Sequence, residues 1–337
     1  MVDMLWAVIG GKETRAGRTT NVDRSTLVIE VDEPNATTTG VLPGTTLTTH
    51  PGDYVITTPG TTISDQEIFG TVYIRAANVT INNCKIRGSS NHHVIDATNA
   101  ACINAVITNC EIFTDYPNNS PNGIQGQNFT IQFCNIYGTV DGINIAGNAT
   151  NLNVVAKQNY IHDLCYITPD SNHSDNQTHN DAIQIQGGLG PLLIQGNSIH
   201  GSYSQTVGTI GSLPDRGTGD ITNGRYNWAA LTCIQFTDNP TNVYTASTGN
   251  NVRVWGNWMY GGKRALNAGS ANNTDIGSWW RNKFDDTQGE RGGGSLAAKA
   301  GYTASMDATT TCDTGEGTSN ANIYMSDGSE ITVRRNQ

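Results

Sequence analysis

Two aspartates stand in matching sequence contexts, and their residue type makes them candidates for chemistry. Asp141 begins the phrase DGINI and Asp181 begins DAIQI, so each is followed by a small residue and then by an isoleucine. Two carboxylates held roughly 5 to 10 Å apart are the minimum for acid and base attack on a glycosidic bond. His179, two residues before Asp181, belongs to the same candidate catalytic set. The stretch between Glu111 and Glu290 has no glutamate, so a catalytic carboxylate there must be an aspartate.

A simpler explanation exists for the same position. Equivalent phrases begin with Asn122, Thr232 and Arg264, which are not acids. Aspartate and asparagine are favoured where a turn enters a strand, because their side chains bond nearby backbone N–H groups. We favour this structural interpretation for Asp141 and Asp181, in which each carboxylate accepts a backbone hydrogen bond, and we keep the catalytic one as the alternative.

These phrases belong to a repeat that spans the middle of the chain. Each unit ends in Cys or Asn, then any residue, then a large apolar residue. The Cys and Asn positions are Cys84, Cys110, Cys134, Asn159, Asn197, Asn257 and Asn282. A period of about 25 residues built from short alternating segments, with no amphipathic helical run, predicts an all-β fold, a right-handed parallel β-helix. Each coil of this solenoid is expected to contribute about three strands.

Stacked coils place equivalent residues in ladders with a spacing of about 4.8 Å. The Cys and Asn positions are expected to form one ladder at a coil corner. A core ladder is predicted from Ile124, Ile143, Ile183, Ile234 and Leu266. Beside it, polar side chains face outward at Gln125, Asn144, Gln184, Gln235 and Asn267. Asn144, Gln184 and Gln235 are therefore candidate substrate contacts, and Arg264 is a candidate for binding an anionic sugar.

A second outward column is rich in rings. It contains Tyr137, His162, His200 and Tyr260. Apolar faces of sugar rings stack on aromatic side chains while side-chain amides bond hydroxyls, so this column is a second candidate for substrate binding. The alternative is that the rings cover the flank of the solenoid or form a contact between subunits.

An insertion, TPDSNHSDNQTHND, precedes Asp181 and is rich in oxygen ligands. Asp170 and Asp175 are candidate ligands for a divalent cation such as Ca²⁺. The spacing matches no known calcium or zinc motif, and insertions of this composition are commonly surface loops. We therefore predict no cofactor and leave Ca²⁺ open as the alternative.

The chain divides into three predicted parts. Residues 1–40 match no repeat and are predicted to be an attachment or capping segment, residues 41–287 the parallel β-helix, and residues 288–337 a C-terminal cap or oligomerisation tail. An open solenoid end must be protected against edge pairing. The unrepeated tail and the outward ring column together lead us to expect a homotrimer.

Composition excludes several classes of protein. With 19 Lys and Arg against 29 Asp and Glu, the chain has a net charge of −10, which argues against nucleic acid as a partner. The apolar run at residues 4–9 is too short for a signal peptide or a membrane span. Seven cysteines without CxxC spacing indicate neither a zinc site nor a disulfide framework, and buried reduced thiols are expected.

Three stretches carry a family resemblance: TGVLPGTTLT at 39–48, TVYIRAANVTINNCKIRG at 71–88 and NYIHDL with HNDAIQIQGG at 159–188. Across roughly residues 39–285 the chain resembles the right-handed β-helix proteins of the pectate-lyase-like superfamily, in the form found in tail and surface proteins of actinobacterial phages. That superfamily includes lyases, hydrolases, epimerases and non-catalytic host-binding spikes. The chain lacks the paired-Asp and GHG motifs of polygalacturonases and the vWiDH-like motif of pectate lyases.

The resemblance, with no export signal in the sequence, implies a structural virion protein. Such a tail spike, fibre or minor tail protein would assemble in the host cytoplasm, contact other virion proteins and touch host surface polysaccharide. Two alternatives stay open. The protein is a polysaccharide lyase or glycosidase acting through Asp181 and Asp141, or it is a secreted protein whose leader has been removed.

Overall fold

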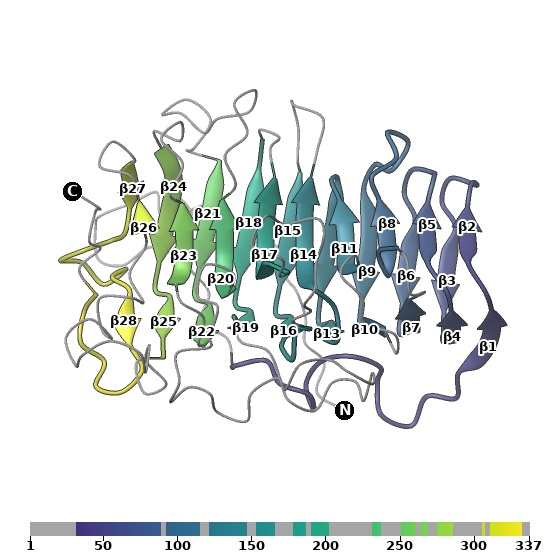
Figure 1. Ribbon diagram of the computed structural model, residues 1–337, viewed down its shortest axis with the longest axis horizontal. Helices are drawn as coiled ribbons and strands as arrows, with labels where there is room; N and C mark the ends of the chain where they lie inside the picture. Colours follow the sequence, from purple (N-terminus) through teal and green to yellow (C-terminus); the bar gives the residue numbers. More distant parts are fainter. Residues whose placement is uncertain are drawn as a thin grey trace, which may run out of the picture.

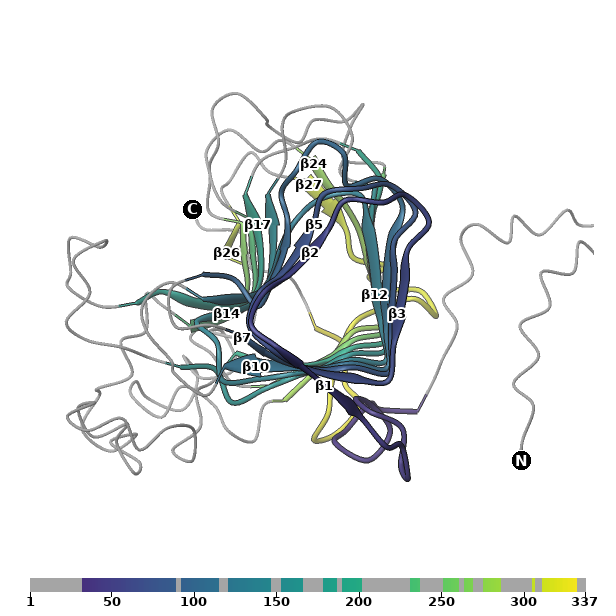
Figure 2. The same cartoon turned by 90° about the vertical axis from the view of Figure 1, so that its right-hand side faces the viewer.

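The computed structural model describes twelve segments of the chain. They are residues 32–88, 92–114, 121–146, 153–165, 178–186, 190–201, 231–236, 251–260, 264–268, 275–285, 305–306 and 311–331. Their regular elements are all strands, and the strands follow one another through three sheets in strict rotation (Figure 1). Viewed along the axis, the sheets form the three walls of a solenoid around one interior (Figure 2). The predicted right-handed parallel β-helix is confirmed.

Sheet 1 has ten strands and sheets 2 and 3 have nine each, all paired in parallel. Sheet 1 contains β1 (Thr48–Pro51), β4 (Gln66–Phe69), β7 (Lys85–Gly88), β10 (Glu111–Thr114), β13 (Asn135–Ile136), β16 (Tyr160–Ile161), β19 (Ser198–His200), β22 (Trp258–Tyr260), β25 (Lys283–Phe284) and β28 (Ile323–Tyr324). Sheet 2 contains β2 (Tyr54–Ile56), β5 (Val72–Ile74), β8 (Ile95–Ala97), β11 (Asn122–Gly126), β14 (Asp141–Ala146), β17 (Asn180–Gln186), β20 (Leu231–Phe236), β23 (Arg264–Ala268) and β26 (Ser305–Met306). Sheet 3 contains β3 (Thr62–Ser64), β6 (Thr80–Asn82), β9 (Ala105–Thr108), β12 (Phe129–Gln132), β15 (Val154–Lys157), β18 (Leu192–Gln195), β21 (Val252–Trp255), β24 (Asp275–Trp280) and β27 (Thr311–Asp313).

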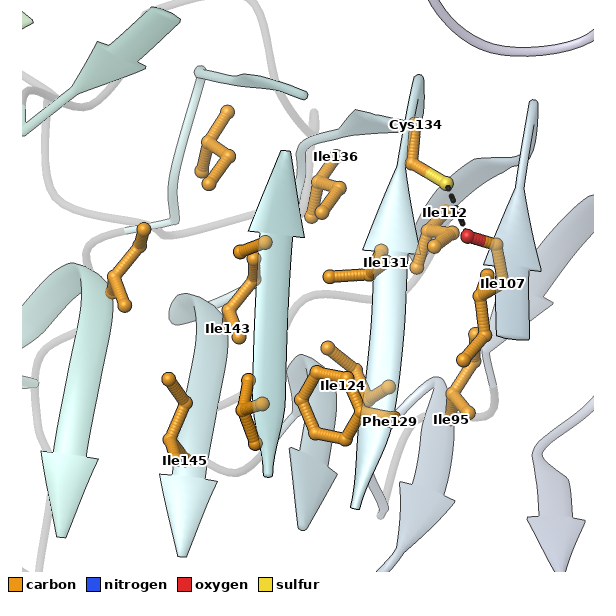
Figure 3. Packing of buried hydrophobic residues seen from close by; sticks show 14 of the residues in the cluster. Ile95, Ile107, Ile112, Ile124, Phe129, Ile131, Cys134, Ile136, Ile143 and Ile145 are labelled. Atoms are coloured by element: carbon orange, nitrogen blue, oxygen red, sulfur yellow. Dashed lines mark hydrogen bonds between the residues drawn. The ribbon is translucent and has the colours of Figure 1, made fainter. Parts of the chain in front are cut away.

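The core is a set of aliphatic ladders that run the length of the solenoid. The register aligns the five predicted core positions of sheet 2 one above another: Ile124, Ile143, Ile183, Ile234 and Leu266. The four isoleucines are fully buried. Figure 3 shows isoleucines of adjacent coils packed together with Phe129 in the interior. Removing this apolar surface from water is the main favourable contribution to folding.

The corner between sheets 3 and 1 carries the predicted ladder of Cys and Asn residues. Four amide pairs form it, because the Nδ2 of each asparagine donates to the Oδ1 of the next at 2.9 Å. The rungs are Asn159, Asn197, Asn257, Asn282 and Asn322, the last of which the repeat did not reveal. The Sγ of Cys134 continues the column, with Ile107 O at 3.9 Å (Figure 3).

The other described cysteines fit the same picture. All six whose surroundings the structure describes are buried and free of disulfides, as predicted. Cys84 and Cys110 contact backbone carbonyls in the way that Cys134 does, at 3.9 and 3.7 Å. Burial raises the pKa of the Cys110 thiol far above its usual range, so the sulfur stays protonated and unreactive.

The residue before each rung explains why this corner needs only a short turn. At this position Asn83, Asn109 and Gly196 have φ values of 56°, 53° and 63°. Asparagine and glycine adopt this left-handed conformation at the lowest cost, which allows the chain to turn from sheet 3 into sheet 1 within two residues. Phe133 and Arg281 also adopt it, at φ values of 54° and 53°, and are held there by the coils on either side.

The segment before β1 lies outside the coils. Residues 32–47, which we call the strap, run along the outer side of sheet 1 from the middle of the solenoid to its first coil (Figure 1). Glu33 Oε1 accepts a hydrogen bond from Ser198 Oγ at 2.9 Å. The N–H of Gly40 donates to Phe133 O at 2.9 Å, and that of Leu42 donates to Asn83 Oδ1 at 2.7 Å. The described part of the predicted attachment segment therefore packs against the solenoid flank.

The three sheets continue beyond the predicted end of the β-helix at residue 287. Strands β26, β27 and β28 each pair in parallel with the strand before them in their sheet. A cap or oligomerisation role for 288–337 stays a prediction, as does an attachment role for 1–40. Among the described residues, none forms a helix long and apolar enough to cross a membrane.

Candidate functional site

The outer face of sheet 2 carries two adjacent columns of polar side chains. In β14, Ile143 and Ile145 face the core, so Asn144 between them faces outward. The register extends this column through Asp96, Gln125, Asn144, Gln184, Gln235 and Asn267. The second column lies at the strand entrances and contains His93, Asn122, Asp141, Asp181, Thr232 and Arg264. We call these two columns the polar face.

A bend in each strand brings the two columns onto one side. A Cβ added to Gly142 would lie 2.5 Å from the core atom Ile161 Cγ2 and 2.6 Å from Ala182 O. Gly142 and Ile143 thus both face inward although they are consecutive, which requires the strand to bend between them. In β11, at the equivalent positions, Asn122 Nδ2 donates to Gln125 Oε1 at 3.0 Å. Close packing of sheets 1 and 2 therefore requires the glycine that follows the strand-entry position in β11 and β14, since a Cβ on Gly123 would also lie 2.7 Å from Ile136 Cγ2.

Asp141 and Asp181 are neighbours on consecutive coils, as the repeat predicts. Asp141 Oδ1 accepts a hydrogen bond from the backbone N–H of Asp181 at 2.9 Å. The side chains are buried, with 5% and 4% of each residue exposed. A carboxylate that accepts a hydrogen bond from a buried backbone N–H stabilises the fold at this position. The observed bond uses the carboxylate of Asp141 and the backbone of Asp181.

The chain enters β17 through a buried network that fixes the position of Asp181. Asn180 Nδ2 donates to Val140 O at 2.8 Å and to Cys165 O at 2.7 Å. Asn180 Oδ1 accepts a hydrogen bond from Thr178 Oγ1 at 3.0 Å. His179 lies between these two buried residues and is itself half-buried. The network holds the strand entrance in one conformation, whatever role Asp181 has.

The polar face has an orphaned acceptor at its centre. Asn144 Nδ2 donates to Gln184 Oε1 at 2.7 Å, while Asn144 Oδ1 is buried with no hydrogen-bond partner in the described part of the chain. Only 4% of Asn144 is exposed. His93 Nδ1, two coils away, is also buried and unpartnered among the described residues. Burial lowers the pKa of His93 to about 4, so its ring is neutral at pH 7. Buried polar atoms are rarely left unpaired, which marks this face as a place for a ligand or an ordered water.

Asp96 lies at the end of the polar face, one coil before Asn122, and its charge is paired. Asp96 Oδ2 accepts a hydrogen bond from Arg75 Nη2 at 2.7 Å, and Asp96 Oδ1 accepts one from the Thr98 N–H at 2.9 Å. Burial by itself would raise the pKa of Asp96, but hydrogen bonds from Arg75, Thr98 and His92 hold it below the usual carboxyl range. Asp96 is ionised, and Arg75 compensates its charge.

The predicted ring column belongs to a different wall. His200 and Tyr260 pair in sheet 1, and Tyr137 and His162 directly follow β13 and β16 of that sheet. Figure 2 shows sheet 1 as a wall separate from sheet 2. Phe113 and Tyr137 stack with centroids 4.8 Å apart, Tyr137 and His162 at 5.4 Å, and His200 and Tyr260 at 4.5 Å. Their interplanar angles are 9°, 28° and 20°, so these rings lie face to face. At least one face of each of these rings is therefore covered by a neighbouring ring.

The strap also contacts this wall. Glu33 bonds Ser198 and lies against Tyr260, whose pKa is raised by burial and by its hydrogen bond with Glu33. The predicted binding residues thus fall into two groups that the structure does not bring together. Asn144, Gln184 and Gln235 belong to the polar face, whereas Tyr137, His162, His200 and Tyr260 belong to sheet 1.

Three predicted site residues cannot be placed by side chain. Asp170 and Asp175 lie outside the described residues. Arg264 pairs with Thr232 in the register of sheet 2, but only its backbone is described. Within the described segments, no three His, Cys, Asp or Glu side chains gather in a way that could hold a metal ion.

One arrangement was not anticipated from the sequence. On the outer face of sheet 3, Trp255 and Trp280 stack with centroids 5.2 Å apart and an angle of 3°. Trp255 Nε1 donates to Ser278 Oγ at 2.9 Å, and the guanidinium of Arg253 lies 5.3 Å from the Trp255 ring. The phrases VRVWGNW and GSWWRN place both tryptophans two residues before a ladder asparagine, and this equivalence was the available signal.

Comparisons with known proteins give no indication of function, so the function must be inferred from the geometry. The chain matched no protein-family model, no curated protein and no solved structure. The parallel strand pairing establishes the architecture, and any association with the pectate-lyase-like superfamily or with phage tails is a matter of proposal.

Proposed function

We propose that the protein is a structural virion component, of the tail spike, fibre or minor tail type, that contacts host surface glycan through the polar face. The observation that carries the proposal is the row of amide side chains centred on the unpartnered Asn144 Oδ1. Glycan hydroxyls both donate and accept hydrogen bonds, and amides supply both functions in return. The rungs repeat about every 4.8 Å along the axis, so an extended polysaccharide can meet several coils at once.

A hydrogen bond between Asp141 and Asp181 favours binding over catalysis. Asp141 Oδ1 is engaged by the Asp181 N–H. A general base needs a free acceptor atom within hydrogen-bonding distance of the proton that it removes, and a backbone N–H already occupies this oxygen. The register places Asn122 and Thr232, neither of which has a carboxylate, at the same strand-entry position.

The second candidate is a polysaccharide lyase or glycosidase acting through Asp181 and Asp141. The observation in its favour is that the two carboxylates stand on adjacent coils, whose spacing of about 4.8 Å is close to the roughly 5 to 5.5 Å of retaining glycosidases. Release of new reducing ends or unsaturated products from host cell-wall polysaccharide would establish this candidate instead of the first.

The test of the proposed function is binding to host polysaccharide with and without the central amide. Asn144→Ala should lower the affinity at least tenfold. Asn153→Gly is the matched control, since it removes an exposed corner amide on another side and suits a φ of 44°. Equal affinity for all three proteins would remove the polar face from the interaction.

The proposal extends to assembly, cofactors and location. We expect a homotrimer bound to other virion proteins, and a monomer by light scattering at micromolar concentration would contradict this. Binding should need no cofactor. If Asp170 and Asp175 hold Ca²⁺, EDTA will weaken binding and added calcium will restore it. Labelled antibody should locate the protein on the exposed part of the virion, and recovery only as a free secreted protein would contradict this location.

A further inference from the structure

A cluster of titratable side chains lies at the end of the polar face that is nearest the first coil. His92 Nε2 lies 3.2 Å from Asp96 Oδ2, and Arg75 Nη2 donates to the same oxygen at 2.7 Å. The side chains of His92 and Arg75 are 38% and 27% exposed, whereas that of Asp96 is only 4% exposed. Two groups that a ligand can reach therefore meet over one buried carboxylate.

The neighbouring side chains hold this cluster in place. The ring of His92 stacks on Tyr73 with centroids 5.4 Å apart and an angle of 24°. The guanidinium of Arg75 lies 5.0 Å from the centre of the same ring. Thr98 donates to Asp96 Oδ1 through its N–H at 2.9 Å and its Oγ1 at 2.6 Å, so the carboxylate is fixed from its other side.

The carboxylate also determines which nitrogen of His92 is free. An ionised carboxylate only accepts hydrogen bonds, so a neutral His92 donates from Nε2 to Asp96 and carries its lone pair on Nδ1. Within the described segments, this Nδ1 has no hydrogen-bond partner. A histidine oriented in this way by a carboxylate is suited to remove a proton from water.

The cluster suits hydrolysis of an ester better than cleavage of a glycosidic bond. Glycoside cleavage needs a carboxylic acid that protonates the leaving oxygen, but Asp96 is ionised and accepts bonds from Arg75, His92 and Thr98. Ester hydrolysis needs a base for the water and a donor for the developing oxyanion. His92 can supply the base. Arg75 can supply the donor, since a guanidinium has five N–H groups and the bond to Asp96 uses one of them.

The cluster is also close to the amides of the polar face. Asp96 precedes Gln125 and Asn144 in one column, at about 4.8 Å per coil. A glycan bound along these amides would present its substituents to His92 within about two coils.

We propose that the protein hydrolyses O-acyl esters, such as acetyl groups, on the glycan that lies along the polar face. His92 and Arg75 are the catalytic residues, and Asp96 is a positioning residue that acts through His92. The inference rests on the proposed function for its natural substrate. It goes beyond that function by assigning a reaction that uses neither Asp141 nor Asp181.

Water is the co-reactant. His92 Nδ1 takes a proton from the water as its oxygen bonds the acyl carbon, and the carbonyl electron pair moves onto the carbonyl oxygen, where Arg75 stabilises the negative charge. The bond between the acyl carbon and the sugar oxygen then breaks, and the sugar oxygen takes the proton from His92. The products are a free carboxylic acid and a sugar hydroxyl, and the side chains return to their starting state.

The test measures acetate released by the full chain from acetylated xylan, acetylated glucomannan and triacetin, a small ester that requires no glycan binding. Binding to the two polysaccharides after chemical deacetylation, and to host cell-wall polysaccharide, is measured in parallel. His92→Gln should lower kcat at least hundredfold because the base is lost, and added imidazole should restore part of the activity of His92→Ala. Asp96→Asn should lower kcat at least tenfold with KM unchanged, because an amide no longer selects the required tautomer. His50→Gln is the matched control, since His50 contacts a backbone oxygen, that of Asp53, at 3.4 Å, and it should leave acetate release unchanged.

The deciding variant is His92→Gln, because the side chain that it replaces is partly exposed, and its thermal melt should match that of His50→Gln. Acetate release that His92→Gln leaves unchanged overturns the inference. So does the absence of release from every ester by a protein that binds the polysaccharides, and in both cases glycan binding stands. Release from triacetin that depends on His92, without binding to any polysaccharide, supports the assigned reaction and overturns the proposed function. Neither binding nor release overturns both.

Discussion

Replacing Asn197 by alanine removes one rung from the buried amide ladder between sheets 3 and 1. Asn197 Oδ1 accepts hydrogen bonds from the N–H and the Nδ2 of Asn159, both at 2.9 Å. Asn197 Nδ2 donates to Asn257 Oδ1 at 2.9 Å and to Ala156 O at 3.0 Å. The side chain thus makes four contacts in a site from which water is excluded.

The loss of stability depends on which groups lose their hydrogen-bond partners. Asn159 Nδ2 still donates to Ile131 O, and Asn257 Oδ1 still accepts from the Asn197 N–H. The Asn159 N–H is left buried without its acceptor, at about 1–3 kcal/mol, and the remaining lost bonds add about 1 kcal/mol. The expected decrease in the free energy of unfolding is about 2 to 4 kcal/mol, a large share of the roughly 5–15 kcal/mol of a typical domain.

Two further variants separate hydrogen bonding from volume. Asn197→Cys installs the residue that the chain itself uses at three rungs, where the thiol retains a weak contact to the same class of carbonyl. It should cost less than alanine but still leave the Asn159 N–H unpaired. Asn153→Gly, on an exposed corner, should change stability by no more than about 1 kcal/mol.

The measurement is urea unfolding followed by far-ultraviolet circular dichroism, with the midpoint and slope fitted for each variant. We expect the order wild type, Asn153→Gly, Asn197→Cys, Asn197→Ala from most to least stable. A loss for Asn197→Ala no greater than that of Asn153→Gly would refute the argument that the ladder holds the coils together.

Three other changes test the polar face, its bend and the ring column. Asp141→Asn should change stability by no more than about 1 kcal/mol and leave glycan binding intact, whereas loss of a measured glycan-release activity would favour catalysis. Gly142→Ala should destabilise by about 1–3 kcal/mol in thermal melts, because its Cβ would meet Ile161 at 2.5 Å; an unchanged melt would contradict the bend. Burial, and then the charge of His162, lowers the pKa of His200 to about 4. The unfolded chain therefore binds the extra proton first as pH falls, so His200 contributes its stability fully above about pH 6.5 and loses it between about 6.5 and 4. His200→Gln should flatten that part of the stability curve, and an unaltered pH dependence would assign it to other groups.

The ladders were predictable from the sequence because a coil corner accepts few residue types. Only Asn, Cys or a similarly small group fits the buried rung, and a left-handed residue such as Asn83 or Gly196 must precede it. The repeat therefore appears directly in the residues. The strand-entry column was equally visible, since Asp141 and Asp181 occupy equivalent positions.

Other features leave no periodic trace. Ring orientation on sheet 1 depends on how Tyr137 and His162 pack against each other, and no spacing in the sequence distinguishes stacked rings from open platforms. The unpartnered Asn144 Oδ1 arises from the choice of Gln184 as partner for the amide nitrogen. The strap was also hidden, because Glu33 and Ser198 are 165 residues apart and neither belongs to a recognisable motif.

The strap has a consequence for the order in which the protein assembles. During synthesis, the coils can stack one after another, since each pairs with the coil made just before it. Glu33 emerges early, but its partner Ser198 is made 165 residues later, so the strap cannot complete its docking until the coil that contains β19 has formed. Its other anchors, Phe133 and Asn83, lie on intermediate coils. A coil that is missing or displaced would move these anchors relative to one another, and the strap would no longer reach all three. Its docking therefore completes only on a solenoid whose intervening coils are all present and in register.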